Sequence, residues 1–132
     1  MFLNKGNILN GIIHFSPREV LEECLKDAIL VDLRREFECA YKKFNVPHVI
    51  YQRPDYVREH YSELPKDIPM IFADNAGLRS REAVEFLIQQ GFTNVANLAG
   101  GMFEWDKDNL PILVNIKERL SGSCLCVLRK TK

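Results

Sequence analysis

Six residues between a predicted strand and a predicted helix carry the clearest chemical signal in the chain. Residues 70–73 form a short apolar run, typical of a strand buried on both faces of a parallel sheet. From Ser80 onward apolar residues recur at helical spacing until Gly91, a residue type that commonly ends helices. The connecting residues 74–79 must turn the chain beside the start of the helix, where several backbone N–H groups face one point. The stretch is therefore predicted to form an anion-binding loop.

The loop and the residue after it read Asp74, Asn75, Ala76, Gly77, Leu78, Arg79 and Ser80. This stretch resembles the active loop of rhodanese-like domains, which has the form Cys-x-x-Gly-x-Arg and is followed by Ser and a helix. Gly77, Arg79 and Ser80 carry the match. In the family, the cysteine at the first loop position accepts a sulfane sulfur as a persulfide, which the surrounding amides hold. The resemblance places Asp74 at that position.

An aspartate in place of the cysteine changes what such a loop can do. A thiolate is a soft nucleophile that attacks sulfur well, and the dipoles of the loop activate it. A carboxylate is a hard oxygen nucleophile that is ionised at neutral pH. We expect Asp74 to occupy the cradle itself, with Arg79 as a charge partner, so that incoming thiosulfate or phosphate meets a fixed negative charge. Sulfur transfer and phosphatase chemistry are both disfavoured at this loop.

Two further motifs extend the resemblance. Residues 31–38 match the family signature Val-Asp-x-Arg-x-x-x-Glu, whose residues mainly organise structure near the active loop. That supporting role is implied here for Asp32 and Arg34. Residues 98–105 match the family's closing motif, in which two glycines turn the chain into a last helix and Trp105 is expected to fill the core.

The two aspartates allow a second interpretation. Asp32 and Asp74 both follow predicted parallel strands, and open α/β sheets build their sites at the carboxyl ends of such strands. Together they would hold Mg²⁺ or resemble a phosphoacceptor pocket. Such a site needs more carboxylates and a placed lysine, which no motif supplies. We therefore predict no metal site and no cofactor.

Alternating strands and helices independently predict an α/β fold, and the resemblance makes it a rhodanese-like one. We expect a central five-stranded, mostly parallel sheet with helices on both faces. The chain is divided into an N-terminal arm (1–11), a rhodanese-like domain (12–112) and a C-terminal tail (113–132). Strands are expected within 11–15, 28–33, 46–51 and 70–73 and from 91 onward, and the first of these is expected to be a short edge strand. Helices are expected from 17, within 36–43 and 54–61, and from 80 and 101.

The first helix has a clear start. Ser16 is a typical N-cap residue, and Pro17 suits the first helical position. The apolar residues that follow at helical spacing predict a buried stripe made of Val20, Leu21, Cys24 and Leu25.

The tail contains a closely spaced pair of cysteines, Cys124 and Cys126. A Cys-x-Cys on a Gly/Ser segment can accept sulfur, act as a redox dithiol, supply half of a soft-metal site or bridge to another chain. Two ligands alone do not make a zinc site. The pair can equally be incidental in a packing strand. Cys24 and Cys39 lie among apolar neighbours and are expected in the core.

Composition limits the remaining choices. The 132 residues are 46% hydrophobic and 27% charged, which fits one globular domain with a real core. Eighteen basic residues balance eighteen acidic ones, so the net charge favours neither nucleic acid nor an anionic membrane as partner. The apolar runs are too short for a membrane span, and the start of the chain does not read as a signal peptide. We expect a cytoplasmic protein whose cysteines are thiols.

Two function classes stay open. The first is a rhodanese-like domain without the loop nucleophile, a non-catalytic binding or regulatory module whose partner is a protein. The second is a sulfurtransferase or sulfur carrier that uses Cys124 or Cys126 and takes sulfur from thiosulfate or a persulfide donor. The chain resembles thiosulfate sulfurtransferases, and inactivity is expected at the usual loop because of Asp74. The position of the tail cysteines relative to Asp74 discriminates between the two.

Overall fold

The structure, a computed structural model, describes residues 6–115 and 126–129. It contains the following elements in chain order: β1 (Asn7–Leu9), β2 (Ile12–Phe15), α1 (Pro17–Lys26), β3 (Ile29–Asp32), α2 (Glu36–Tyr41), β4 (Lys42–Phe44), β5 (Val49–Tyr51), α3 (Pro54–His60), the 3₁₀ helix η1 (Tyr61–Glu63), β6 (Met70–Ala73), α4 (Leu78–Gln89), β7 (Val95–Leu98), α5 (Gly101–Lys107), β8 (Ile112–Asn115) and β9 (Cys126–Arg129).

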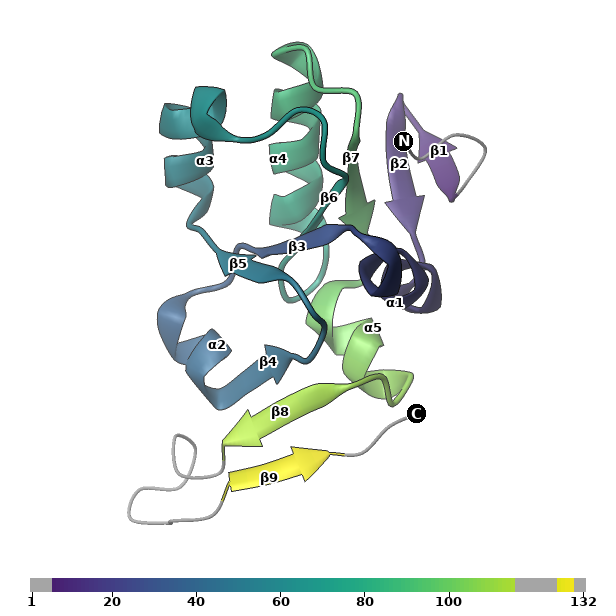
Figure 1. The fold of residues 1–132 in the computed structure, drawn as a ribbon, viewed down its shortest axis with the longest axis vertical. Coiled ribbons are helices and arrows are strands. Elements are labelled where there is room, and N and C mark those ends of the chain that lie inside the picture. The colour runs from purple at the N-terminus through teal and green to yellow at the C-terminus, as the bar shows by residue number, and fades with distance from the viewer. Residues whose placement is uncertain (1–5, 116–125, 130–132) are drawn as a thin grey trace.

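Two sheets organise these elements (Figure 1). The larger sheet has six strands in the order β1-β2-β7-β6-β3-β5, and the smaller has the order β4-β8-β9. Five neighbouring strands of the larger sheet are mutually parallel, as predicted, namely β2, β7, β6, β3 and β5. The sixth strand, β1, comes from the expected N-terminal arm and pairs antiparallel with β2. The prediction that residues 11–15 form an edge strand is therefore wrong, because β1 covers that edge.

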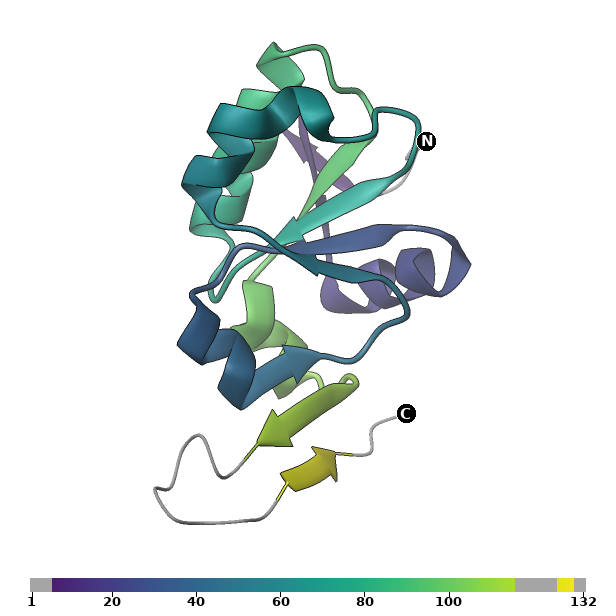
Figure 2. The same ribbon diagram turned by 60° about the vertical axis from the view of Figure 1, so that its left-hand side comes forward.

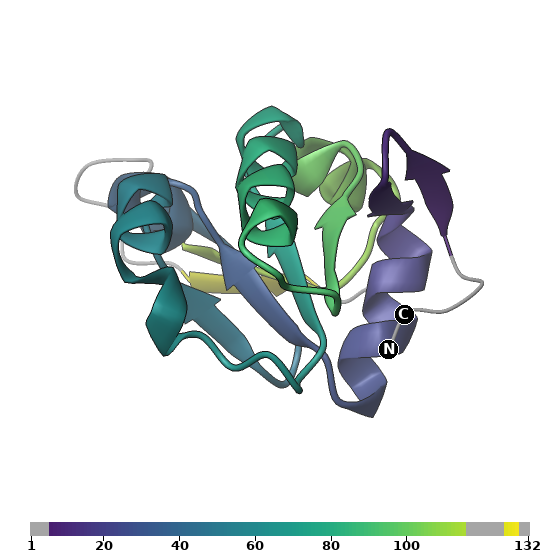
Figure 3. The same ribbon diagram turned by 90° about the horizontal axis from the view of Figure 1, so that it is seen from above.

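Helices cover both faces of the large sheet (Figure 2). Neighbouring strand residues alternate between two hydrophobic clusters, as the pleat requires. Leu30 and Ile71 join the cluster that contains residues of α1, α5 and the small sheet. Val31 and Phe72 join the cluster that contains residues of α3 and α4. Viewed from above, the β1–β2 hairpin and α3 lie at opposite ends of the molecule, in agreement with the strand order (Figure 3).

The first helix begins as predicted. The Ser16 hydroxyl accepts a hydrogen bond from the Glu19 backbone N–H, and the Glu19 carboxylate accepts one from the Ser16 N–H. Val20 and Cys24 are buried, but Leu25 is exposed. One residue further along a helix turns the side chain by about 100°, so Leu25 leaves the stripe that Val20 and Cys24 share. The prediction of Leu25 as a buried residue is wrong.

The predicted helix within 36–43 is shorter than expected. It ends at Tyr41, and Lys42 and Lys43 lie in β4, which pairs antiparallel with β8. Phe44, the last residue of β4, is buried and packs edge-to-face on Trp105, with ring centroids 5.2 Å apart. Pairing with β8 and burial of Phe44 thus override the local helical pattern.

The small sheet connects the expected tail to the domain. β8 begins at Ile112, so it runs across the expected boundary, and it pairs with β4 on one side and β9 on the other. Cys126 lies in β9 opposite Asn115 in the strand register. Cys124 lies outside the described residues. Within 6–115 and 126–129, no helix is long and apolar enough to cross a membrane.

Candidate functional site

The predicted loop lies where the central strand β6 meets α4. Asp74 follows the last residue of β6 directly, and Gly77 caps the N-terminus of α4 with a left-handed backbone (φ 92°). A side chain at Gly77 would also press on the chain at Gly100, because its Cβ would lie 3.0 Å from the Gly100 nitrogen. The tight turn between strand and helix therefore depends on this glycine.

The carboxylate of Asp74 lies inside the loop and is 6% exposed. Its Oδ1 accepts hydrogen bonds from the backbone N–H groups of Ala76 (3.1 Å) and Gly77. Its Oδ2 accepts hydrogen bonds from those of Arg79 (2.7 Å) and Ser80 (3.2 Å). Four backbone donors thus converge on one anionic group, the arrangement that an anion-binding loop offers to a ligand.

The start of α5 supports the loop from behind. The backbone N–H of Met102 donates to the Asp74 carbonyl (2.8 Å), and that of Phe103 donates to the Asn75 carbonyl (3.0 Å). Gly101 permits this approach, because a Cβ there would lie 2.4 Å from the Asp74 carbonyl oxygen. The closing motif therefore helps to fix the loop, a contact that no local sequence pattern predicts.

A buried polar network extends from the loop into the sheet. The Ser80 hydroxyl donates to the side-chain oxygen of Asn97, which is buried in β7. The Asn97 amide donates to the Gly77 carbonyl (3.3 Å) and lies 3.1 Å from His14 Nδ1 in β2. Burial, and secondarily the charge of Arg81, lowers the pKa of His14, which favours the neutral ring that can accept this bond.

Asp32 and Arg34 form a buried ion pair beside the loop. The carboxylate of Asp32 accepts bonds from Arg34 Nε (3.0 and 3.3 Å) and Nη2 (2.8 Å). Arg34 Nη2 also donates to the Lys42 carbonyl (2.7 Å) at the start of β4. The pair ties the end of β3 to the small sheet.

Two side chains of the loop point away from the Asp74 carboxylate. The Asn75 amide donates to the Glu38 carboxylate on α2. Among the described residues the Arg79 side chain makes no ion pair with Asp74; it lines a separate hollow between α3 and α4 together with Asp55 and Glu82. Arg79 reaches Asp74 only through its backbone N–H. The expected charge pairing of its guanidinium is therefore wrong.

No divalent metal site forms from the two aspartates. The Asp32 carboxylate is bonded to Arg34 and the Asp74 carboxylate to backbone N–H groups, so neither offers its oxygens to Mg²⁺. Within the described part of the chain, no cluster of three or more His, Cys, Asp or Glu side chains is arranged to hold a metal ion.

The two buried cysteines of the domain are poor nucleophiles. Cys24 and Cys39 are buried free thiols. Desolvation by burial is the main cause that raises the pKa of each to about 12. Both are therefore protonated at neutral pH. The structure describes the backbone of Cys126, in the outer strand of the small sheet, while Cys124 lies in the part it does not describe.

Apolar side chains surround the loop at the surface. Leu78, at the start of α4, is 61% exposed, Phe103 on α5 is 67% exposed, and Phe37 on α2 is 65% exposed. Phe103 and Phe37 line two hollows that both include Asn75 and Met102. Exposed apolar side chains thus lie at the start of α4 and on α2 and α5, the two helices whose residues share these hollows with Asn75.

Comparisons with known proteins show which family of proteins the chain is similar to. A family model described as a rhodanese-like domain matches residues 16–108. A protein named sulfurtransferase from Allochromatium vinosum is 34% identical over 88 residues, which cover 67% of this chain and 80% of that protein. The thiosulfate sulfurtransferase GlpE of Haemophilus influenzae is 32% identical over 98 residues, which cover 74% of this chain and 90% of that protein.

Solved structures share the architecture. A crystal structure of a rhodanese-related protein from Thermoplasma volcanium matches with a TM-score of 0.67 and 26% identity. The match covers 77% of this chain and 98% of that one. It includes the arrangement of a mostly parallel sheet between helices on which the loop is built.

Proposed function

The chain belongs to the family of rhodanese-like domains, and we propose that within this family it acts as a non-catalytic binding or regulatory module. In this proposal Asp74 stands where the family carries its catalytic cysteine. The supporting observation is the set of four backbone N–H groups that donate to the Asp74 carboxylate. Because those donors are already used by a fixed negative group, a thiosulfate anion finds neither a nucleophilic sulfur nor free donors there.

The proposed partner is a protein. The exposed apolar side chains around the loop, with two aromatic rings among them, have the composition that favours protein interfaces. The overall charge balance of eighteen basic and eighteen acidic residues gives no reason to expect nucleic acid or an anionic membrane. A cytoplasmic location is part of the proposal, because it suits cysteines that stay reduced.

A thiosulfate sulfurtransferase assay with cyanide as sulfur acceptor tests the proposal. We expect negligible thiocyanate formation by the native protein. Asp74→Cys is expected to create turnover, because its thiolate would take the sulfane sulfur of thiosulfate, release sulfite and pass the sulfur to cyanide. Asp74→Ser, which also removes the carboxylate but supplies no thiol, is the matched control and stays inactive. Robust native turnover that survives Cys124→Ser and Cys126→Ser together would overturn the proposal.

A sulfur-handling role of the tail is the second candidate. The names of relatives about 30% identical to this chain, which include sulfurtransferases, favour it. In this version Cys124 or Cys126 carries the sulfur, with thiosulfate or a persulfide as donor. Native turnover that disappears in the double serine variant would support it. Mass spectrometry after exposure to thiosulfate would then locate the added sulfur on one of these two residues.

A further inference from the structure

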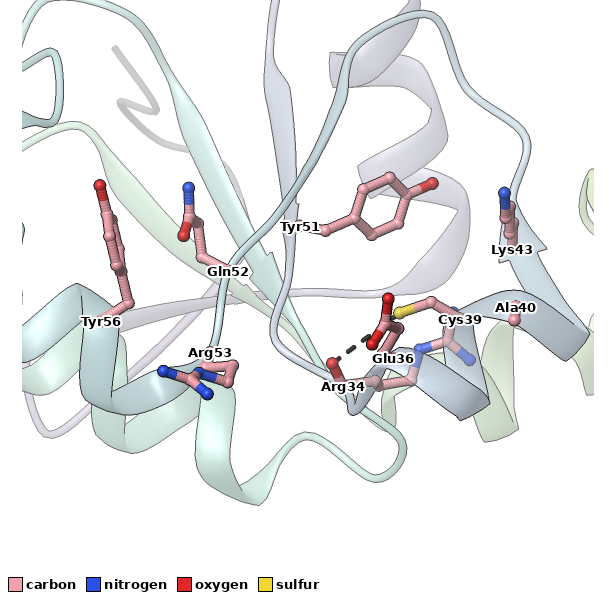
Figure 4. Close-up of a pocket in the computed structure, with 9 residues that line it drawn as sticks. All are labelled: Arg34, Glu36, Cys39, Ala40, Lys43, Tyr51, Gln52, Arg53 and Tyr56. Atoms are coloured by element: carbon pink, nitrogen blue, oxygen red, sulfur yellow. Dashed lines mark hydrogen bonds between the residues drawn. The ribbon is translucent and has the colours of Figure 1, made fainter.

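A cavity separate from the loop opens at the carboxyl end of β5. Its volume is about 520 Å³, within the range of small-molecule sites. None of the loop residues 74–80 lines it. Its walls come from the end of β3, α2, β4, the edge strand β5 and the start of α3 (Figure 4), and they consist of Arg34, Glu36, Cys39, Ala40, Lys43, Tyr51, Gln52, Arg53 and Tyr56.

Arg34 supplies a buried cation to this cavity. Its side chain is 2% exposed, yet its hydrogen bonds use only part of the guanidinium. Nε and Nη2 donate to Asp32, and Nη2 also donates to the Lys42 carbonyl. Nη1 donates to no described residue, and it is not among the fully enclosed unpaired atoms of the described side chains. Arg34 lines both this cavity and the hollow that contains Phe37, so the two N–H donors of Nη1 remain available to an acceptor that enters a space lined by Arg34.

The rim of the cavity is predominantly basic. Lys43 and Arg53 border it together with a single carboxylate, that of Glu36. Arg53 is 3.4 Å from Asp55 in an exposed pair, whereas Lys43 has no carboxylate partner among the described residues. An anion in the cavity would thus meet one unpaired ammonium at the rim and the free donors of Arg34 at the wall.

The remaining walls suit a flat apolar body. The Tyr51 ring reaches over the side of the cavity where Cys39 and Glu36 lie, and Tyr56 borders its other end (Figure 4). Cys39 is a buried thiol that behaves as a small apolar group, and Ala40 leaves space on α2. Aromatic walls with a few placed polar groups are typical of small-ligand sites.

From these features we propose that the cavity binds a small aromatic acid, a ligand class distinct from sulfur anions. Its carboxylate or sulfonate accepts from Arg34 Nη1 and lies near Lys43, and its ring packs against Tyr51. The inference is independent of the proposed function of the loop, because none of the loop residues 74–80 lines the cavity.

A titration of the ¹⁵N-labelled full chain with 2-naphthoate, followed by NMR, tests the proposal. The matched probe is 2-naphthamide, which keeps the ring but carries no charge. We expect saturable shifts centred on the amides of Cys39, Ala40, Tyr51 and Gln52 and on the side-chain nitrogens of Arg34. Because a hydrogen bond to a charged group is lost, the amide should bind about tenfold more weakly than the acid.

Three surface substitutions sharpen this test. Lys43→Gln should weaken naphthoate binding, and Glu36→Gln should strengthen it, each by about two- to fivefold, while neither changes binding of the neutral amide. Ala40→Phe should abolish binding of both probes by filling the cavity. Lys107→Gln, on α5 and outside the cavity, is the control and should leave both affinities unchanged.

Three outcomes would overturn the proposal. The first is the lack of a saturable shift below about 1 mM naphthoate. The second is equal affinity for the acid and the amide. The third is a set of shifts centred on the loop, or on the hollow lined by Phe37 and Met102, in place of the cavity. The sulfurtransferase assay reports on the loop alone, so failure of one proposal is distinguishable from failure of the other.

Discussion

At the scale of single residues, the Asp74 side chain does what a bound anion would do. It satisfies backbone donors of a strand-to-helix turn that otherwise need a ligand or water. Its negative charge at the start of α4 also interacts favourably with the helix dipole. The position of Asp74 could be predicted from the sequence, because this residue directly follows a buried strand and begins the turn that Gly77 ends.

The other residues of the site could be predicted only in part. His14 and Asn97 belong to different strands, and their contact with the loop depends on the pairing of β2 with β7, which no local pattern contains. The direction of the Arg79 side chain was missed for a similar reason. Arg79 lines the hollow between α3 and α4, which Asp55 and Glu82 also line.

Removal of the carboxylate should convert the loop into an anion site. In Asp74→Ala the four backbone donors lose their acceptor, which we expect to cost about 1–3 kcal/mol of unfolding free energy. Sulfate should then refill the loop. The melting temperature of Asp74→Ala is expected to rise more with sulfate than that of the native protein, measured against chloride at equal ionic strength. Equal sulfate responses of the two proteins would show that the donors do not converge.

The close approach of α5 to the loop gives a second prediction. Gly101→Ala places a Cβ 2.4 Å from the Asp74 carbonyl oxygen at a left-handed backbone (φ 60°). We expect a loss of about 1–3 kcal/mol in urea unfolding. Gly11→Ala is the matched control, because Gly11 is also left-handed (φ 80°) but has open space around it. A loss at Gly101 no larger than at Gly11 would contradict the contact.

At the scale of elements, continuous apolar runs predicted the central strands well, because parallel strands covered on both faces need such runs. The short strands β1, β4 and β8 were missed as strands. Each has only three or four residues, and each is stabilised by pairing partners distant in sequence or by a hairpin. Lys42 and Lys43 show this effect, since their neighbours in β8 determine their conformation.

The free energy of unfolding should depend on pH through His14, which lies in β2 beside Asn97 of β7. Burial and Arg81 lower the pKa of His14 below its ordinary value of 6.5. At pH values between the lowered pKa and 6.5, the unfolded chain binds more protons than the native chain. The contribution of His14 to the free energy of unfolding therefore rises with pH and is lost as pH falls below about 6.5. We expect the stability difference between the native protein and His14→Asn, which keeps an acceptor, to shrink as pH falls through this window. Chemical denaturation at several pH values measures this difference in stability. A difference that stays constant with pH would contradict the lowered pKa of His14.

At the scale of the whole molecule, the fold could be predicted because two independent signals indicated the same α/β fold. These signals are the three spaced motifs and the alternation of strands and helices. The small sheet was not predicted. It forms where β4 and β8 complete one side of the core around Phe44, Trp105 and Ile112. Trp105 is fully buried, as expected, and donates its indole N–H to the Pro111 carbonyl (2.9 Å), so this residue links α5 to the turn before β8.

Two adjacent residues of β8 test whether the small sheet is part of the cooperative core. Ile112 is fully buried, whereas Leu113, on the opposite face of the strand, is 40% exposed. Ile112→Ala should cost about 2–5 kcal/mol in urea unfolding, and Leu113→Ala only about 0.5–1 kcal/mol. Similar small losses for both variants would mean that the sheet unfolds separately from the domain.

The pKa of the new thiol in Asp74→Cys tests the central claim most directly, namely that the loop is an intact anion cradle filled by its own carboxylate. The measurement is made with Cys124 and Cys126 replaced by Ser, while Cys24 and Cys39 stay protonated because their pKa values are about 12. The thiolate absorbance of the new residue is followed against pH. We predict a pKa well below 8.5, the value of an unperturbed cysteine. A thiol that titrates at about 8.5 or higher would contradict the account.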